Sequence, residues 1–435
     1  MPEASISLIL GYVWQFVKAW WWVPLPFVLR KPAVYLWQFW RVEGFLKKQK
    51  MVLLEIKIPE ESLKPIRAME TVFAGLWQAF WDPGRPWEQW WEGKRTLGFQ
   101  LETVSIGGEA HFYIRCPDYR RDIVESSIYS QYPEAEITLA QEDYTRKVPQ
   151  DMPNKDWNFW AADYRFLRPD PYPIKTYPEF EKETEKEEEK RIDPMATLLE
   201  VMAKMKPGEQ LWYQIQASPI AEEVAEPFFE EGKALRDKLA KRPEEPKPKS
   251  MIQEAAEILI TGKTPGEKAP EKFELIAPEL RLTPGEKDII TGVERKISKP
   301  PFKCSIRFIY LGKREVWFRA NLRLIFAYFG SYFTQNMNAL VPLGKTITKV
   351  DSIPPLSILD HRRLYLRQRK IFRLYRERFS PTFPRGGDRK TGTVVLNTEE
   401  LASLYHLPSR AVAPAMGVPR VEAKRGGPPP ELPIE

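Results

Sequence analysis

The order of predicted elements in the first third of this 435-residue chain constrains its fold more than any other feature. A β-rich segment, Met51–Ile58, precedes Glu61–Trp77, where apolar residues recur every three or four positions, as in a helix. Two alternating segments, Leu97–Ile106 and Glu109–Cys116, flank a Gly-Gly pair that is typical of a hairpin turn. A second helix and a last strand complete a β-α-β-β-α-β order, which predicts a ferredoxin-like, split βαβ unit within residues 46–145.

A second unit of the same kind is predicted within residues 193–350. It would contain an opening helix, an alternating strand at Leu211–Ala217, a strand at Phe302–Leu311 and a following aromatic-rich helix. Residues 222–298 would form a helical insertion between its two halves. Residues 146–192, which include a run of Glu and Lys, would be a linker. The predicted fold class is therefore α+β, with two ferredoxin-like units.

Residues 1–45 are predicted to be a membrane anchor. Ile6–Leu29 is 24 residues long with one charge, Lys18, and about 20 apolar residues cross a bilayer as a helix. The alternative is an amphipathic helix that lies in the interface. Lys and Arg follow Leu29, so the positive-inside rule predicts an inner-membrane protein with the bulk of its chain in the cytoplasm. The predicted membrane-interface residues are Trp14, Trp20, Trp21, Trp22, Trp37 and Trp40.

A Trp-rich insertion separates the first helix from the second strand. It contains Trp87, Trp90 and Trp91, which are candidate partner-docking residues because exposed Trp clusters tend to mark contact surfaces. The alternative is that these rings cover an open face of the small sheet.

Residues 351–410 carry a basic helix followed by a short strand and helix. Within residues 361–390, 11 Lys and Arg stand against Glu377 and Asp388, a local balance of +9 that exceeds the +7 of the whole chain. Nucleic-acid phosphates or anionic lipid headgroups would suit this pattern, and a solvated helix or one on an acidic partner is the plainer interpretation. The candidate phosphate-binding residues are Arg362, Arg363, Arg367, Arg369, Lys370 and Arg373.

The sequence predicts no catalytic, cofactor-binding or metal-binding residues. Two cysteines and three dispersed histidines do not supply a disulfide scaffold, a Cys-rich zinc site or a His-based triad. Gly262-Lys263-Thr264 and the similar tripeptide at Gly344 end like a P-loop, but each lacks the earlier glycine that this motif requires. The chain is therefore expected not to be an enzyme.

Several blocks resemble the N-terminal region, a domain of unknown function, of conjugation and type IV secretion ATPases of the coupling-protein and TraG/HerA-like class. The blocks follow the Trp-rich start of the chain and are Leu54–Leu76, Asp193–Pro219, Thr283–Leu311, Phe333–Leu340 and Val395–Pro408. In that family, a proline-rich segment like the Pro/Gly-rich tail at 411–435 leads into a RecA-like motor. This sequence contains no Walker motifs, so no catalytic residue is carried over, and the motor is expected to be a separate polypeptide or missing by truncation.

The resemblance implies a non-catalytic, membrane-anchored component of a translocation machine that serves as an assembly platform for a P-loop ATPase. Family members act as rings, which implies a homo-oligomer. The capped helix near residue 400 and the tail would dock the motor, and the candidate docking residues there are Asn397, Glu400 and Tyr405. The alternative function is a membrane-associated nucleic-acid-binding protein that uses residues 361–390, with DNA as its partner.

Overall fold

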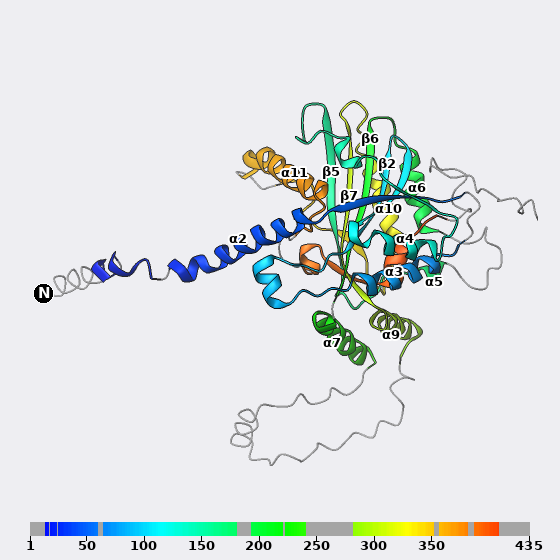
Figure 1. Ribbon diagram of the computed structural model, residues 1–435, viewed down its shortest axis with the longest axis horizontal. Helices are drawn as coiled ribbons and strands as arrows, with labels where there is room; N and C mark the ends of the chain where they lie inside the picture. Colours follow the sequence, from blue (N-terminus) through cyan, green and yellow to red (C-terminus); the bar gives the residue numbers. More distant parts are fainter. Residues whose placement is uncertain are drawn as a thin grey trace, which may run out of the picture.

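The computed structural model describes residues 14–16, 18–23, 25–59, 64–180, 193–220, 222–240, 282–351, 356–381 and 387–408. These residues form one nine-stranded sheet with helices on both faces, and one long helix projects from the body (Figure 1). The predicted tail from residue 411, most of the Glu/Lys run and the middle of the predicted insertion lie outside the described residues.

The first four strands supply one half of the sheet, in the spatial order β4-β1-β3-β2. All of their pairings are antiparallel. The elements of this half are β1 (Met51–Lys57), α3 (Ile66–Phe80), η1 (Glu88–Glu92), β2 (Phe99–Ile106), β3 (Glu109–Pro117), η2 (Asp118–Arg120), α4 (Arg121–Tyr129) and β4 (Glu136–Leu139).

The next four strands repeat this connectivity in the other half, in the order β6-β7-β5-β8. The elements are η3 (Tyr144–Arg146), β5 (Trp157–Phe166), α5 (Tyr177–Phe180), α6 (Pro194–Ala203), β6 (Glu209–Pro219), α7 (Glu222–Leu239), α9 (Pro284–Ile297), β7 (Pro301–Lys313), α10 (Asn321–Gly330) and β8 (Leu340–Pro342). The last elements are η6 (Leu356–Leu359), α11 (Asp360–Arg376), η7 (Arg389–Thr391), β9 (Val394–Asn397) and α12 (Thr398–Leu404), and β9 pairs with the start of β7.

The prediction of two small ferredoxin-like units is wrong, because the two halves share one sheet. Strand β2 pairs with β6 along its whole length, from Phe99 opposite Ala217 to Ile106 opposite Gln210. Each half alone would leave this edge unpaired, and an unpaired strand edge readily accepts another strand. The residues assigned to a linker, 146–192, also contain strand β5, whose continuous apolar run shows no clear alternation.

The predicted membrane anchor and inner-membrane location are also corrected. Within the described part of the chain, none of the helices combines the length and apolarity that crossing a bilayer requires. The apolar stretch is broken by a turn after Trp20, and α2 (Leu25–Lys48) begins beyond it with Pro26 in its first turn. Helix α2 then carries charges such as Arg30, Lys31 and Arg41, which are costly in a bilayer core.

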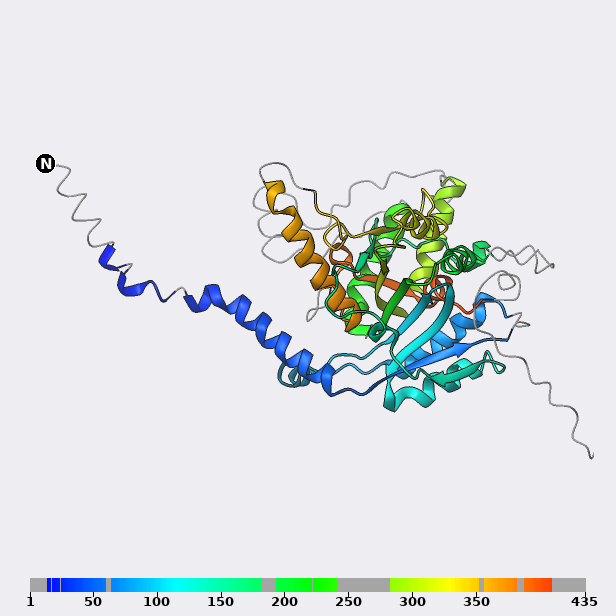
Figure 2. The same ribbon diagram turned by 90° about the horizontal axis from the view of Figure 1, so that it is seen from above.

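The two faces of the sheet bury different kinds of side chain. One face, here called the closed face, packs against α3, α4, α6, α10 and α12 in the large apolar core. The opposite face, here called the polar face, carries a second, smaller apolar cluster, which α11 covers together with Tyr144, Val148 and Met152. In this cluster Phe372 of α11 packs on Phe159 and Trp212. Figure 2 shows α11 and α2 on the same side of the molecule, running away from the sheet. Arg373 of α11 and Glu43 of α2 meet at 3.6 Å where the two helices leave the body.

Candidate functional site

The Trp-rich insertion packs against α2 and forms an aromatic cluster with it. The Trp37 indole N–H donates to the Trp90 carbonyl over 3.1 Å. The Trp37 ring meets the rings of Trp40 and Trp91 edge to face, each at 5.7 Å between centroids. The Arg41 guanidinium lies 4.6 Å from the Trp37 centroid and 4.7 Å from the Trp40 centroid, within cation–π range. We call Trp37, Trp40, Arg41 and Trp91 the tryptophan cluster.

A glycine allows this close approach. Residue Gly93 ends η1 with a φ of +72°, a conformation that disfavours other residues. A Cβ added there would lie 2.4 Å from the Arg41 carbonyl carbon and 2.6 Å from the Val42 nitrogen. The insertion is therefore fixed to the backbone of α2, at the point where the helix joins the body.

The predicted docking residues of the insertion are exposed and do not cover the sheet. The exposed fraction is 52% for Trp87, 40% for Trp90 and 56% for Trp91, and it reaches 63% for Trp40 on the neighbouring helix. The residues predicted to lie at a membrane interface are exposed as well, apart from the partly buried Trp37; those before α2 are Trp14, Trp20, Trp21 and Trp22. Clusters of exposed apolar side chains tend to mark interaction sites.

The basic helix α11 is held to the body at several of its predicted phosphate-binding residues. Arg367 donates to the carbonyls of Ile347 and Lys349, at 3.0 and 2.8 Å. Arg373 pairs with Glu377 in its own helix and with Glu43 of α2. Both guanidinium groups therefore have structural partners.

The remaining predicted cations of α11 lie in the exposed part of the helix. These are Arg362, Arg363, Arg369 and Lys370. The Arg369 guanidinium lies 5.8 Å from the ring centroid of Tyr365, which is 40% exposed. A cation beside an exposed ring can stack on a base as well as neutralise a phosphate.

Helix α12 has no exposed surface on which a partner could dock. All of its residues are buried, as are the three predicted docking residues, Asn397, Glu400 and Tyr405. The capping box inferred from the sequence is present: the Asn397 side chain accepts from the Glu400 N–H at 2.8 Å, and Glu400 accepts from the Asn397 N–H at 3.2 Å. The Glu400 carboxylate also pairs with buried Lys296 at 3.0 Å. All three residues are therefore part of the core, and none of them is exposed to a partner in this fold.

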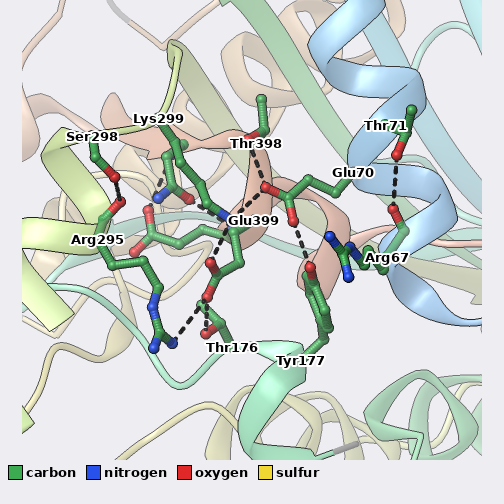
Figure 3. A network of polar contacts seen from close by, with 12 residues as sticks. Arg67, Glu70, Thr71, Thr176, Tyr177, Arg295, Ser298, Lys299, Thr398 and Glu399 are labelled. Atoms are coloured by element: carbon green, nitrogen blue, oxygen red, sulfur yellow. Dashed lines mark hydrogen bonds and ion pairs between the residues drawn. The ribbon is translucent and has the colours of Figure 1, made fainter. Parts of the chain in front are cut away.

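A polar network joins α12 to α3, α5 and the segment between α9 and β7 (Figure 3). The Glu70 carboxylate accepts from the Tyr177 hydroxyl and the Lys299 ammonium, each at 2.5 Å, and from Thr398 at 3.0 Å. The same Lys299 pairs with Glu399 at 2.7 Å. Burial, helped by the bond to Glu70, raises the pKa of Tyr177. The network fixes the C-terminal helix between elements that are distant in sequence.

The polar face of the sheet holds a row of charged and amide side chains in register. Glu102, Gln214, Arg307 and Asp163 lie opposite one another across β2, β6, β7 and β5. We call this set the inner row. Arg307 donates to main-chain carbonyls at the end of α11 and lies 3.7 Å from Asp163.

One arginine beyond α11 closes the inner row. Arg378 has a φ of +58°. Its guanidinium donates two hydrogen bonds to the Glu102 carboxylate, of 2.5 and 3.0 Å. The same guanidinium donates two hydrogen bonds to the Asp143 carboxylate, of 2.7 and 3.0 Å. No local sequence pattern points to these residues, because 276 positions separate Arg378 from Glu102 and only the tertiary fold brings them together.

Within the described residues, no group of His, Cys, Asp and Glu is arranged to hold a metal ion. A comparison with protein-family models and curated proteins gives no match to this chain. The resemblance to secretion ATPases therefore stays a prediction from the residues alone.

Proposed function

We propose that this protein is a non-catalytic assembly component that docks a partner protein on the exposed aromatic surface of α2 and η1. The observation that carries the proposal is the tryptophan cluster, which holds two large rings, Trp40 and Trp91, in fixed positions while more than half of each stays exposed. Trp and Arg are the residue types most enriched among the energetically dominant residues of protein interfaces. Fixing their rings before binding lowers the entropy cost of the contact.

The proposed partner is the P-loop ATPase of a secretion or conjugation machine. This identity rests on the sequence resemblance, as does assembly into a homo-oligomeric ring. The charge of α2 also constrains the partner surface, because the helix is strongly basic and has a single acid, Glu43. Its basic residues are Arg30, Lys31, Arg41, Lys47 and Lys48. The partner surface is therefore expected to be apolar with an acidic border, because complementary charge guides association.

Co-purification of the full-length chain with its ATPase tests this proposal. The informative variant combines Trp40→Ala with Trp91→Ala and retains Trp37, so that the insertion stays bonded to α2. The matched control is Phe318→Ala. Phe318 is also exposed, at 62%, but it follows the C-terminal end of β7, whereas the start of β7 lies near α2. We expect the recovered ratio of ATPase to fall at least about tenfold for the double variant, since interface Trp residues contribute about 2 kcal/mol or more each. Unchanged recovery in the double variant, or equal loss in the control, would contradict the proposal.

A second candidate function is nucleic-acid binding by α11, and the exposed cations beside Tyr365 favour it. Binding would be strongly salt-dependent, because each neutralised phosphate releases counterions. Arg367 and Arg373 are left intact in the test, since they hold the helix in place. The test variant neutralises Arg362, Arg369 and Lys370 with Gln.

The control neutralises three exposed cations on other elements, Lys204, Lys233 and Arg323. The slope of log affinity against log salt is expected to fall by about 2 to 3 in the α11 variant and to stay constant in the control. DNA binding that is absent, or equally weakened in both variants, would contradict this function.

A further inference from the structure

A pocket of about 770 Å³ lies between the C-terminal half of α2 and the polar face of the sheet. This volume is within the range of small-molecule sites, roughly 300–1,000 Å³. Its wall is apolar and includes Val42, Leu46, Leu97 and Ile220. Its floor is polar and is formed by side chains of four neighbouring strands. The pocket therefore offers an apolar side and a hydrogen-bonding side to one ligand.

The floor is a second set of residues in register, next to the inner row. Arg115, Gln100, Gln216 and Ser305 lie opposite one another across β3, β2, β6 and β7. Two residues further along the strands, Ser218 lies opposite Lys303. Because alternate residues of a strand point to the same face, all six side chains line the pocket. We call these six residues the outer rows.

The outer rows differ from the inner row in that their cations have no carboxylate partner. Within the described residues, no ion pair involves Arg115, Lys303 or Arg95, a third cation that lines the pocket. Arg115 donates to the Gln100 amide oxygen at 3.2 Å. Among the described residues that line the pocket, Glu377 is the one acid, and it pairs with arginines of α11.

Nearby carboxylates do not neutralise these cations. The charges of Glu102 and Asp143 attract Arg115 without forming an ion pair with it, and both carboxylates are bound by Arg378. Asp170 and Asp388 attract Lys303 without forming an ion pair with it. The pocket therefore keeps an excess of positive charge beside a low-dielectric wall.

The protonation equilibria agree with this geometry. Burial, reinforced by the charge of Arg378, lowers the pKa of Arg115 to about 10. Burial also lowers the pKa of Arg95 and of Lys303. In addition, the Gln216 amide oxygen and the Thr393 hydroxyl, which both line the pocket, are buried and have no hydrogen-bond partner in the described part of the chain. Such groups are costly to bury unless a ligand or water satisfies them.

We propose that this pocket binds a small organic phosphate of mononucleotide size. Its phosphate groups would contact Arg95, Arg115 and Lys303, which supply several separate positive charges rather than the single fork that one carboxylate needs. Its less polar part would lie against Val42 and Leu46 of α2. This assignment is independent of the partner-docking function, because it uses a different surface of α2.

The proposal is tested by measuring the binding of ADP to the full-length chain, both by calorimetry and by the shift in melting temperature. Inorganic phosphate, adenosine and a short DNA oligonucleotide serve as comparison probes. The variants are Arg115→Gln and Lys303→Gln, and the matched control is Lys204→Gln, an exposed lysine directly after α6. We expect saturable ADP binding that each pocket variant weakens about tenfold or more, since a charged hydrogen bond is lost. The control is expected to bind like the wild type.

Three outcomes would overturn the assignment. The first is an absence of ADP binding at millimolar concentration by the folded wild-type chain. The second is equal affinity for ADP and inorganic phosphate, because the apolar wall would then contribute nothing. The third is equal ADP binding by the wild type and by a chain that combines Arg115→Gln with Lys303→Gln. Oligonucleotide binding that survives in this double variant would point to the α11 surface and would not support the pocket.

Discussion

The two faces of the sheet use the same strands for different purposes. On β7, Phe308 points to the closed face and stacks on Tyr213 at 4.5 Å, whereas the adjacent Arg307 points to the polar face. The closed face is sealed by α12, whose carbonyls at Ser403 and Leu404 accept from tyrosine hydroxyls beneath them. The polar face holds charged rows and a pocket, and α2 and α11 project beside it. The closed face is thus filled by the main apolar core, whereas the polar face combines structural ion pairs with an open pocket.

The largest effect is expected on the closed face. Phe308 is fully buried and its ring meets four other aromatic rings. We expect Phe308→Ala to lower the free energy of unfolding by about 3–5 kcal/mol, because it removes buried area and leaves a cavity. Denaturant unfolding measures this change. Exposed Phe318→Ala should change stability by less than about 0.5 kcal/mol, and similar losses for the two variants would contradict the assignment of the core.

A smaller loss is expected from breaking the inner row. The variant Arg378→Met leaves buried Glu102 without its bidentate partner, and removing one member of a buried ion pair costs about 3 kcal/mol. Adding Glu102→Gln to this variant removes the uncompensated charge and should restore part of the stability. If the double variant proved less stable than Arg378→Met alone, the prediction that an unpaired Glu102 charge causes the loss would be wrong.

The next effect in size is the pH dependence of stability that arises from the pairing of Arg378 with Asp143 beside the inner row. Burial alone would raise the pKa of Asp143, but the bonds and charge of Arg378, together with Thr145, lower it to about 2. A depressed carboxyl pKa stabilises the fold above the unfolded-state value near 4, and this contribution is lost as the pH falls toward 2. The stability difference between wild type and Asp143→Asn should therefore be about 2 kcal/mol at pH 6 and shrink below pH 4. A difference that does not change between pH 6 and pH 2 would contradict the pairing.

The smallest effect on stability is expected in the outer rows. The folded state disfavours the charged form of Arg115, whose pKa is lowered, so neutral Arg115→Gln should leave the melting temperature unchanged or raise it. This sign is opposite to that expected for Arg378→Met on the same face. A clear loss of stability in Arg115→Gln, measured without ligand, would mean that Arg115 is a structural residue and that the two rows do not differ.

Local patterns in the sequence predicted local features well. The capping box at Asn397 depends on residues three positions apart, and it is present. The order of helices and strands in residues 51–140 follows from hydrophobic periodicity, which is also a local property. Exposure of Trp87, Trp90 and Trp91 was one of two alternatives that the sequence left open, and the structure selects it.

The features that were wrong or missed depend on contacts between distant residues. Burial of α12 follows from its packing on α3 and α5, and a seven-residue helix does not itself show which neighbours it has. The pairing of β2 with β6 depends on two edges that are separated by more than 100 residues. The inner row and the pocket floor arise from that pairing. The functional candidates of the polar face were therefore hidden until the register of the sheet was known.

The proposed functions require partners to bind beside α2 and α11 while the closed face stays structural. Oxidative footprinting of the full-length chain, alone and in its complex with the ATPase, tests this most directly because exposed tryptophans react readily. We predict that oxidation of Trp40, Trp87 and Trp91 falls severalfold in the complex, whereas that of Phe318 and Phe333 does not change. Protection of Phe318 and Phe333 with undiminished oxidation of the three tryptophans would show that the ATPase binds elsewhere on the molecule.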